Sequence, residues 1–340
     1  MTRRLALFVL AAAVFVSGCN RAPDTPAPSG SSSTPAPAAL TKYRIGLGPW
    51  VGFGPFYLAR EKGFFKEAGL DVELIVLTGL SERNSALKSG RIDALAAPVD
   101  YFVLSAGNRL ETTIAMAVDE SVGGDGIVSR KTITKVDDLR GKRVAFQHGL
   151  PGEFFLRALL LRNKLSLSDL KVTDLQTADA GAAFIAGKVD AAVVWEPWLT
   201  KATEQGKGRV LASTKDYPNL IVDCLAFNKD VVSRSPGDVQ KIVNVIFKAM
   251  DYWKQNPDES NRIMAPNFQL DPAKYAVVLS GARFTDVARN REFFGSEQKP
   301  GPIYEVADRA SEIWLAAKVI QSPVAPPTII STRFVEQAGK

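Results

Sequence analysis

The 340-residue chain is poor in the side chains that commonly perform metal and nucleophilic chemistry. It has one histidine, His148, and two cysteines. A metal site built on two or three histidines is therefore excluded. A Ser-His-Asp arrangement would need His148, yet no Gly-x-Ser-x-Gly elbow presents a nucleophile. We predict no catalytic residue and no metal, and we interpret His148 as either a plain loop residue or a ligand contact.

Loops that bind nucleotides are also missing. The chain has no Walker loop, and Gly46-Leu47-Gly48 at the first predicted strand lacks the third glycine in register. No cofactor is therefore predicted. Although the net charge is +6, the 42 lysines and arginines are interspersed with 36 aspartates and glutamates. No basic run is interleaved with aromatics, so the composition predicts a mixed solvated surface and no nucleic-acid partner.

The N-terminus lacks an apolar run long enough to span a bilayer, which needs ~20 residues. Residues 5–16 are apolar, follow Arg3 and Arg4, and end in Val16-Ser17-Gly18-Cys19. A charged, an apolar and a small-residue stretch in this order are typical of an export signal. The last four residues resemble the bacterial lipobox, which implies a signal peptide at 1–18 and lipidation of Cys19. The alternative is an ordinary cleaved signal that happens to end in cysteine.

After Cys19 the composition changes to that of a tether. Residues 20–40 are almost wholly Pro, Ala, Ser, Gly and Thr, which cannot bury enough surface to fold. We predict a lipidated cysteine and flexible tether at 19–41, which would anchor the protein in the cell envelope facing the periplasm or the outside. Cys224 then has no disulfide partner and is interpreted as a buried, inert thiol.

From residue 43 onward, strand and helix patterns alternate. Such a succession is typical of βαβ units, and it predicts an α/β fold with mostly parallel sheets. A longer amphipathic helix is predicted near the C-terminal part, at 236–256. The earlier elements are strands at 43–47, 71–77, 142–146 and 171–175 and helices at 55–62 and 154–163.

An internal repeat indicates two equivalent lobes. The sequence ALKSGRIDAL (86–95) is echoed by AFIAGKVDAA (183–192). Each copy predicts a helix end, a glycine in a left-handed C-cap, a basic residue and a short buried strand. We place chain crossings between the lobes near 121–125 and near 222–226. Lobe 1 is then 42–123 plus 227–340, and lobe 2 is 124–226.

Five stretches resemble one family of proteins. They are GPWVGFGPFYLA (48–59), KGFFKEAGLDV (62–72), SGRIDA (89–94), DDLRGKRVA (137–145) and GKVDAAVVWEPW (187–198). In this order they resemble the nitrate/sulfonate/taurine-type substrate-binding proteins of ABC transporters, a family shared with binders of thiamine pyrimidine precursors.

The resemblance implies a type II periplasmic binding protein fold, with two α/β lobes joined by two hinge strands and a ligand cleft between them. It implies capture of a small solute of the sulfonate, taurine or nitrate class and delivery to an ABC transporter permease, by a monomer and without catalysis. One alternative is a binder of an amino-pyrimidine or similar heterocycle. A different kind of alternative is an enzyme or a sensory module on the same fold.

Candidate ligand contacts come from loops that follow strands and open helices, where free amides favour ligand binding. Four such loops are 50–53, 78–81, 148–153 and 177–181. Aromatic candidates could instead close a core, Ser81 and Asp179 could be helix N-caps, and the segment around Glu196 could be a structural turn. The predicted ligand-binding residues are Trp50, Phe53, Ser81, Asp100, Asp125, His148, Glu153, Asp179, Trp195 and Glu196.

Several of these candidates are acidic. Glu196, Asp125 and Glu153 would repel bare nitrate or sulfate but would suit a ligand with an amine or another donor-bearing end. Trp50 and Trp195 could add cation–π contacts. A zwitterion or an amino-heterocycle is therefore predicted in preference to a simple anion.

Overall fold

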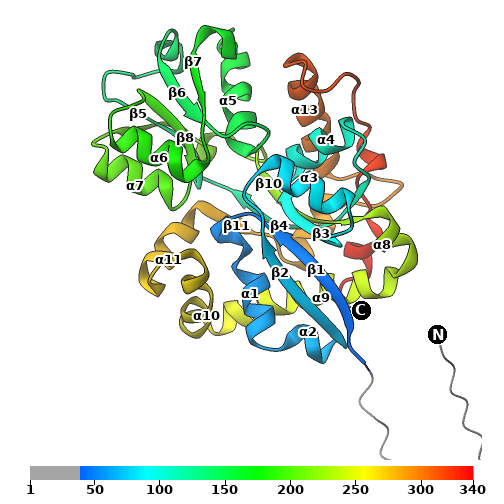
Figure 1. Ribbon diagram of the computed structural model, residues 1–340. Coiled ribbons are helices and arrows are strands. Elements are labelled where there is room, and N and C mark those ends of the chain that lie inside the picture. The colour runs from blue at the N-terminus through cyan, green and yellow to red at the C-terminus, as the bar shows by residue number, and fades with distance from the viewer. Residues whose placement is uncertain (1–38, 340) are drawn as a thin grey trace, which may run out of the picture. The chain divides into compact units, whose positions relative to one another are not determined.

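The computed structural model describes residues 39–339 (Figure 1). The predicted signal peptide, Cys19 and nearly all of the predicted tether lie outside these residues. None of the helices within 39–339 combines the length and the apolarity needed to span a bilayer. Two separate β-sheets organise this part of the chain.

The first sheet has six strands in the order β11-β4-β10-β3-β1-β2. β1 lies between β2 and β3 and runs parallel to both, whereas β10 is antiparallel to β3 and β4, and β11 is antiparallel to β4. The strands are β1 (Thr41–Leu47), β2 (Leu70–Val76), β3 (Ala94–Pro98), β4 (Thr112–Ser121), β10 (Val222–Asn228) and β11 (Ala282–Phe284).

The second sheet has five strands in the order β7-β6-β8-β5-β9. Again one part is parallel, since β6 pairs in parallel with β7 and β8, and β5 is antiparallel to both β8 and β9. The prediction of mostly parallel sheets is thus wrong, because the strands next to the crossings enter each sheet from the opposite end. These strands are β5 (Asp125–Ser129), β6 (Arg143–Phe146), β7 (Lys171–Asp174), β8 (Ala191–Trp195) and β9 (Arg209–Ser213).

Helices pack around both sheets, with α5, α6 and α7 beside the second sheet and most others beside the first (Figure 1). All six strands and helices predicted before residue 176 are present, and so is the long helix predicted at 236–256. The helices are α1 (Gly54–Glu61), α2 (Phe64–Glu67), α3 (Leu80–Lys88), α4 (Val99–Gly107), α5 (Pro151–Arg162), α6 (Thr177–Ile185), α7 (Trp198–Gln205), α8 (Lys229–Arg234), α9 (Pro236–Gln255), α10 (Pro257–Met264), α11 (Pro272–Val278), α12 (Val287–Phe294), α13 (Pro302–Ala316) and α14 (Arg333–Gln337).

The internal repeat folds into the same local structure twice. In the first copy, Asp93 Oδ2 accepts from Arg44 N at 2.8 Å and from Arg44 Nε at 3.4 Å, and Arg44 Nη2 donates to Gly90 O at 2.8 Å. Gly90 has a φ of 66°, in the left-handed region that a side chain disfavours. We call this arrangement the Arg–Asp clasp of the first sheet.

The second sheet has the corresponding Arg–Asp clasp. Asp190 Oδ2 accepts from Arg143 N at 2.9 Å and from Arg143 Nε at 3.1 Å, and Arg143 Nη2 donates to Gly187 O at 3.4 Å. Gly187 has a φ of 77°. Each clasp ties the strand β1 or β6 to the turn before β3 or β8, so the two sheets share one folding unit.

The chain leaves the first sheet after Ser121 and returns at Val222. The two crossings are joined by Thr214 Oγ1, which lies 2.7 Å from Ser121 Oγ and accepts from Gly123 N at 2.8 Å. The predicted return at 222–226 differs from the structure, because all of β10 pairs with strands of the first sheet. The division into lobes at the stated boundaries stays a prediction.

Candidate functional site

A small cavity lies where the carboxyl ends of β1, β3 and β8 meet the crossings. Its volume is about 30 Å³. That is room for one or two water molecules and not for an organic solute, since a water needs ~10–15 Å³ on this measure. Both sheets contribute to its wall, which consists of Gly48, Pro49, Trp50, Phe53, Arg83, Ala97, Pro98, Asp125, Pro151, Trp195, Ile221 and Asp223.

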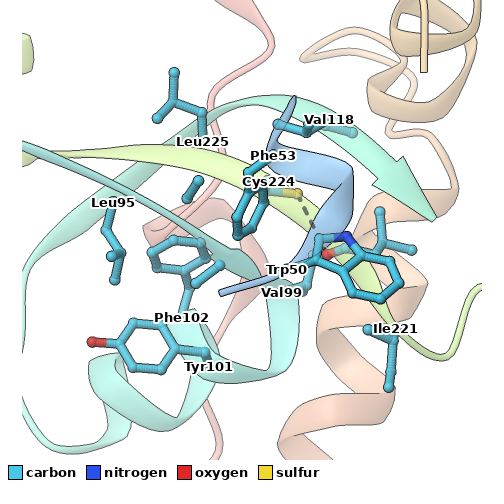
Figure 2. Packing of buried hydrophobic residues seen from close by; sticks show 14 of the residues in the cluster. Trp50, Phe53, Leu95, Val99, Tyr101, Phe102, Val118, Ile221, Cys224 and Leu225 are labelled. Carbon is cyan, nitrogen blue, oxygen red and sulfur yellow. Dashed lines mark hydrogen bonds between the residues drawn. The ribbon is translucent and has the colours of Figure 1, made fainter. Parts of the chain in front are cut away.

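Aromatic side chains from the first predicted loop form one side of the cavity. Trp50 lies next to Ile221, and Phe53 lies near Cys224 (Figure 2). Trp50 Nε1 donates to both carboxylate oxygens of Asp119, at 3.0 and 3.2 Å. A Cβ on Gly52 would come within 2.4 Å of Asp119 Oδ2, so glycine is required for this approach. Trp50 and Phe53 therefore both close a core and face the cavity.

Four buried aspartates lie on the cavity wall or next to residues of it, none more than 5% exposed. Asp125 and Asp223 line the cavity, Asp119 is hydrogen-bonded to Trp50, and Asp100 follows Pro98 by two residues. Burial raises the pKa of Asp100 and of Asp119 to about 8 and that of Asp125 to about 7. Burial, reinforced by the neighbouring carboxylates, raises the pKa of Asp223 well above its ordinary value. Near neutral pH these groups therefore hold protons that exposed aspartates would have lost.

Two of these aspartates are direct neighbours across the strands. In the first sheet, Asp223 of β10 is paired with Asp119 of β4 on one side and with Pro98 of β3 on the other. Asp100 follows Pro98 by two residues, and neither of its carboxylate oxygens has a hydrogen-bond partner. The carboxyl groups thus gather at the same edge of the first sheet.

Arg83 on α3 is the cation on the cavity wall. It is 3% exposed, and its Nε donates to Leu77 O at 3.1 Å. Asp223 and Asp100 act on it through space, without a hydrogen bond, and burial lowers the pKa of its guanidinium. A buried guanidinium beside a cavity can bind an acidic ligand group with two parallel hydrogen bonds.

Trp195 and Glu196, which were both predicted to contact the ligand, have different positions in the structure. Trp195 lines the cavity. Glu196 is 8% exposed, but its carboxylate accepts from Thr200 N at 3.2 Å and from Thr200 Oγ1 at 2.7 Å, at the start of α7. Burial still raises the pKa of Glu196. Its lone pairs are thus partly used within the protein.

His148 and Glu153 belong to a separate hydrogen-bonded group. Glu153 accepts from Gly149 N at 2.7 Å and from Arg157 Nε at 2.7 Å, and it lies 3.1 Å from His148 Nδ1. An arginine one helical turn away satisfies this buried carboxylate. Neither His148 nor Glu153 is on the cavity wall.

Ser81 and Asp179 are exposed and also lie off the cavity wall. The interpretation of the two as N-caps is wrong. The N-cap of α3 is Gly79 and that of α6 is Gln176, and neither helix has a side-chain cap. Both helices begin earlier than predicted, so Ser81 and Asp179 lie inside the first turn.

Contacts between elements of the two sheets hold the sheets together. Gln147 Nε2, after β6, donates to Thr78 O, after β2, at 2.9 Å. Gly149 packs so closely on Leu80 that a Cβ there would lie 2.1 Å from Leu80 Cδ2. Phe154 of α5 lies 5.6 Å from Trp314 of α13 between ring centroids. The described conformation is therefore closed.

Sequence reasoning missed Arg83, Asp119 and Asp223 on or beside the wall. Asp119 has a usable signal, because it ends the apolar run Ile114–Val118, all of which is buried. Asp223 lies in the Val-Asp-Cys stretch that marked a crossing. Arg83 carries no signal, because an arginine on a short helix ordinarily faces solvent.

The arrangement supports binding better than chemistry. Within residues 39–339, no group of three His, Cys, Asp or Glu side chains is placed to hold a metal ion. The wall has one guanidinium, two carboxyl groups and three aromatic side chains, which suits an organic molecule with both acceptor and donor groups.

Comparison with known proteins agrees with this geometry. A protein of Brucella abortus described as a putative binding protein is 27% identical over 221 residues, which cover 64% of this chain and 68% of that protein. A putative aliphatic sulfonates-binding protein of Bacillus subtilis is 25% identical over 309 residues, covering 88% of each. A 4-amino-5-hydroxymethyl-2-methylpyrimidine phosphate synthase of Saccharomyces cerevisiae is 26% identical over 228 residues, covering 60% of this chain and 64% of that enzyme.

Among solved structures, the alkanesulfonate-binding protein from Xanthomonas axonopodis pv. citri, bound to MOPS, matches with a TM-score of 0.72. It is 20% identical and covers 87% of this chain and 100% of its own, which confirms the predicted binding-protein fold. The family model described as NMT1/THI5 like matches residues 50–260, more than half of the sequence. The chain therefore belongs to the NMT1/THI5-like family.

Proposed function

We propose that this protein is the extracytoplasmic solute-binding component of an ABC importer, capturing a small organic solute between its two sheets. The observation that carries the proposal is the cavity, which lies at strand ends of both sheets and is bounded by the two crossings. In α/β proteins, ligands bind at such strand ends. The relatives named as binding proteins support the same activity.

The solute belongs to the sulfonate and taurine class or is an amino-pyrimidine. Arg83 supports an acidic end, as a sulfonate would provide, and the aromatic wall of Trp50, Phe53 and Trp195 supports an apolar or ring-shaped middle. Bare nitrate would leave the apolar wall without a partner. A permease is the partner that such a protein serves.

An enzyme is the second candidate, favoured by the relative from Saccharomyces cerevisiae that is named as a synthase. In the described part of this chain, the single histidine is held by Glu153 and lies off the cavity wall, and Cys224 is buried. Burial raises the pKa of Cys224 well above its ordinary value, which disfavours the reactive thiolate. These features support binding without turnover.

Lipid anchoring at Cys19 completes the proposal. A bacterial lipoprotein carries three acyl chains, and two or more such signals anchor a protein stably in a membrane. Cys19→Ser is expected to move the protein from the membrane fraction to the aqueous fraction. Labelled fatty acid should be incorporated into the original chain and not into the variant; unchanged fractionation with no label in the original would contradict the anchor.

The solute is best identified by native mass spectrometry of the purified Cys19→Ser protein, followed by calorimetry with the released compound. We expect one small organic molecule per chain, recovered chemically unchanged after prolonged incubation. Conversion of the compound into a product would instead support the enzyme. No bound or binding solute in a panel of sulfonates and pyrimidines would contradict the proposed function.

A further inference from the structure

Three carboxyl groups from three different segments of the chain lie on or next to the cavity wall. Asp100 lies at the start of α4, Asp125 at the start of β5 and Asp223 at the start of β10. Asp125 and Asp223 are on the cavity wall. Asp100 is not on the wall; it is 2% exposed and follows the wall residue Pro98 by two residues, and Pro98 pairs with Asp223 in the sheet.

The other acidic groups nearby already have partners in the protein. Asp119 accepts two hydrogen bonds from Trp50 Nε1, and Glu196 accepts two from Thr200. Asp100, by contrast, has two buried oxygens without any hydrogen bond. Leaving a buried carboxyl without a partner is costly, and native proteins rarely do so without a reason. A donor supplied from outside the chain would satisfy it.

We propose that Asp100, Asp125 and Asp223 form a subsite for the ammonium or amidinium group of the solute, which is therefore a zwitterion or a protonated heterocycle. This proposal rests on the proposed function and adds the class of solute. Arg83 would bind the acidic end, and Trp50 and Trp195 would flank the cation. A metal cation is disfavoured, because no three acidic side chains among residues 39–339 have the geometry to hold one.

Binding of a cation at this subsite is coupled to loss of protons. Burial raises the pKa of Asp100 to about 8 and of Asp125 to about 7, so both are partly protonated near neutral pH. An adjacent ammonium group stabilises the ionised carboxylates and lowers these pKa values. The solute therefore releases protons as it binds, and its affinity rises with pH between about pH 6 and about pH 8.

Other charged groups face the same subsite and set the size of this effect. From the neighbouring elements these are Asp119 on β4, Glu196 after β8 and Arg83 on α3. The two acids raise the pKa values of the subsite further, and Arg83 opposes them. Because acids outnumber the single cation, the balance favours the protonated state in the absence of solute.

Calorimetry with two matched pairs of probes tests the proposal. The pairs are taurine with ethanesulfonate, and 4-amino-5-hydroxymethyl-2-methylpyrimidine with its 4-hydroxy analogue; within each pair only the amine differs. We expect the amine-bearing member of at least one pair to bind about thirtyfold more tightly or better. Titrations in phosphate and in Tris should differ in heat, because released protons are taken up by buffers with different ionisation enthalpies.

Asp125→Asn is expected to reduce the protons released and to remove most of the preference for the amine. Asp179→Asn, an exposed carboxylate off the cavity wall, is the matched control and should change neither. Asp100→Asn gives a second variant if Asp125→Asn fails to fold.

Two results would overturn the subsite while leaving the proposed function intact. One is equal or tighter binding of the amine-free probes, unchanged in Asp125→Asn and Asp100→Asn. The other is a co-purifying solute that carries no cationic or protonatable nitrogen. Failure of every probe, together with no co-purifying solute, would contradict the proposed function itself.

Discussion

An acid follows each copy of the internal repeat, one residue out of register, and the environments of the two acids differ: Asp100 is the second residue after β3 and Glu196 is the first after β8. Each acid follows the short buried strand of its copy, β3 or β8, at the edge facing the cavity. Glu196 turns back to Thr200 in the first turn of α7, whereas both oxygens of Asp100 have no partner. Both halves of a duplicated scaffold can thus carry an acid just after the corresponding strand, and only one of the two acids is free for a ligand.

The rest of the repeat shows the same contrast between the two ends of each sheet. Away from the cavity, the two Arg–Asp clasps share three hydrogen bonds of the same kind, and the second has one more, from Arg143 Nη2 to Asp190 Oδ1. After β1 the chain carries Trp50 and Phe53 on the cavity wall, whereas after β6 it carries His148 and Glu153 off the wall, where Glu153 is hydrogen-bonded to both His148 and Arg157. The shared features support folding, and the differing features belong to the site.

The largest expected effect comes from comparing the two acids directly. Asp100→Asn should weaken binding of an amine-bearing solute by about thirtyfold or more, because truncating the partner of a buried charge costs about 2–5 kcal/mol. Glu196→Gln should weaken it by less than about threefold, since Thr200 already uses that carboxylate. Calorimetry of both variants measures their affinity for the solute. Equal losses of affinity would mean that Asp100 and Glu196 contribute equally to binding.

The same pair should differ in the pH dependence of stability. Asp100 loses its proton near pH 4 when unfolded but at about pH 8 when folded. The unfolded state therefore binds fewer protons between these values, and stability falls as pH rises through this window. Asp100→Asn should raise the free energy of unfolding at pH 8 by on the order of 3 kcal/mol, with a smaller gain at pH 5.

For Glu196→Gln we expect a smaller gain in the free energy of unfolding, because the carboxylate of Glu196 is stabilised by two hydrogen bonds from Thr200. Urea unfolding of both variants at the two pH values, without solute, provides the measurement. An Asp100→Asn gain that does not change with pH would show that Asp100 is ionised in the folded protein.

Two glycines offer the next comparison: Gly52 in the helical turn after β1 and Gly152 in the first turn of α5, the helix after β6. A Cβ on Gly52 would lie 2.3 Å from Trp50 Nε1, whereas a Cβ on Gly152 would meet nothing closer than 3.5 Å. Gly52→Ala should therefore lower the free energy of unfolding by about 2 kcal/mol, as overpacked cores do. Gly152→Ala, within α5, should be neutral or slightly stabilising, because alanine favours helix. Thermal unfolding of the two variants measures the difference. Similar shifts in Tm for both would contradict the close packing of Trp50 on Asp119.

The smallest expected effect concerns the clasps. Arg44→Ala and Arg143→Ala should each cost less than about 1 kcal/mol, because both arginines are about half exposed and their ion pairs are screened. Arg143 lowers the pKa of Asp190 to about 2. The stabilisation from the Arg143–Asp190 ion pair is therefore fully present above about pH 4. It is lost as the pH falls through the lowered pKa of Asp190, about 2. Denaturant unfolding of Arg143→Ala and the original protein should converge in acid; a cost that persists there would indicate lost packing instead.

The sequence predicts the scaffold well because its elements depend on local patterns. The strands β1 and β6 and the helix α9 follow from the period of their apolar residues. The left-handed glycines Gly90 and Gly187 follow from the repeat and are confirmed by their φ angles.

The site is harder to predict because burial of charge depends on distant packing. Asp223 meets Asp119 only because β10 pairs with β4, and the two residues are far apart in the chain. Arg83 is buried by tertiary contacts that its own helix does not reveal. Glu153 shows the reverse case, since Arg157 four residues later could have indicated a satisfied ion pair. The prediction of mostly parallel sheets was wrong for a similar reason, because the strands next to the crossings run in the opposite direction to their neighbours.

The hydrogen bond from Gln147 to Thr78 has a kinetic consequence. A cavity of about 30 Å³ cannot admit a solute, so the two sides must separate before capture. Opening then sets an upper limit on the rate of association, and at high solute concentration the observed rate should reach a plateau and stop rising. Only the open fraction of molecules is competent, so the apparent dissociation constant exceeds the intrinsic one by the inverse of that fraction. Gln147→Ala would enlarge the open fraction, raise the plateau and speed both arrival and departure of the solute.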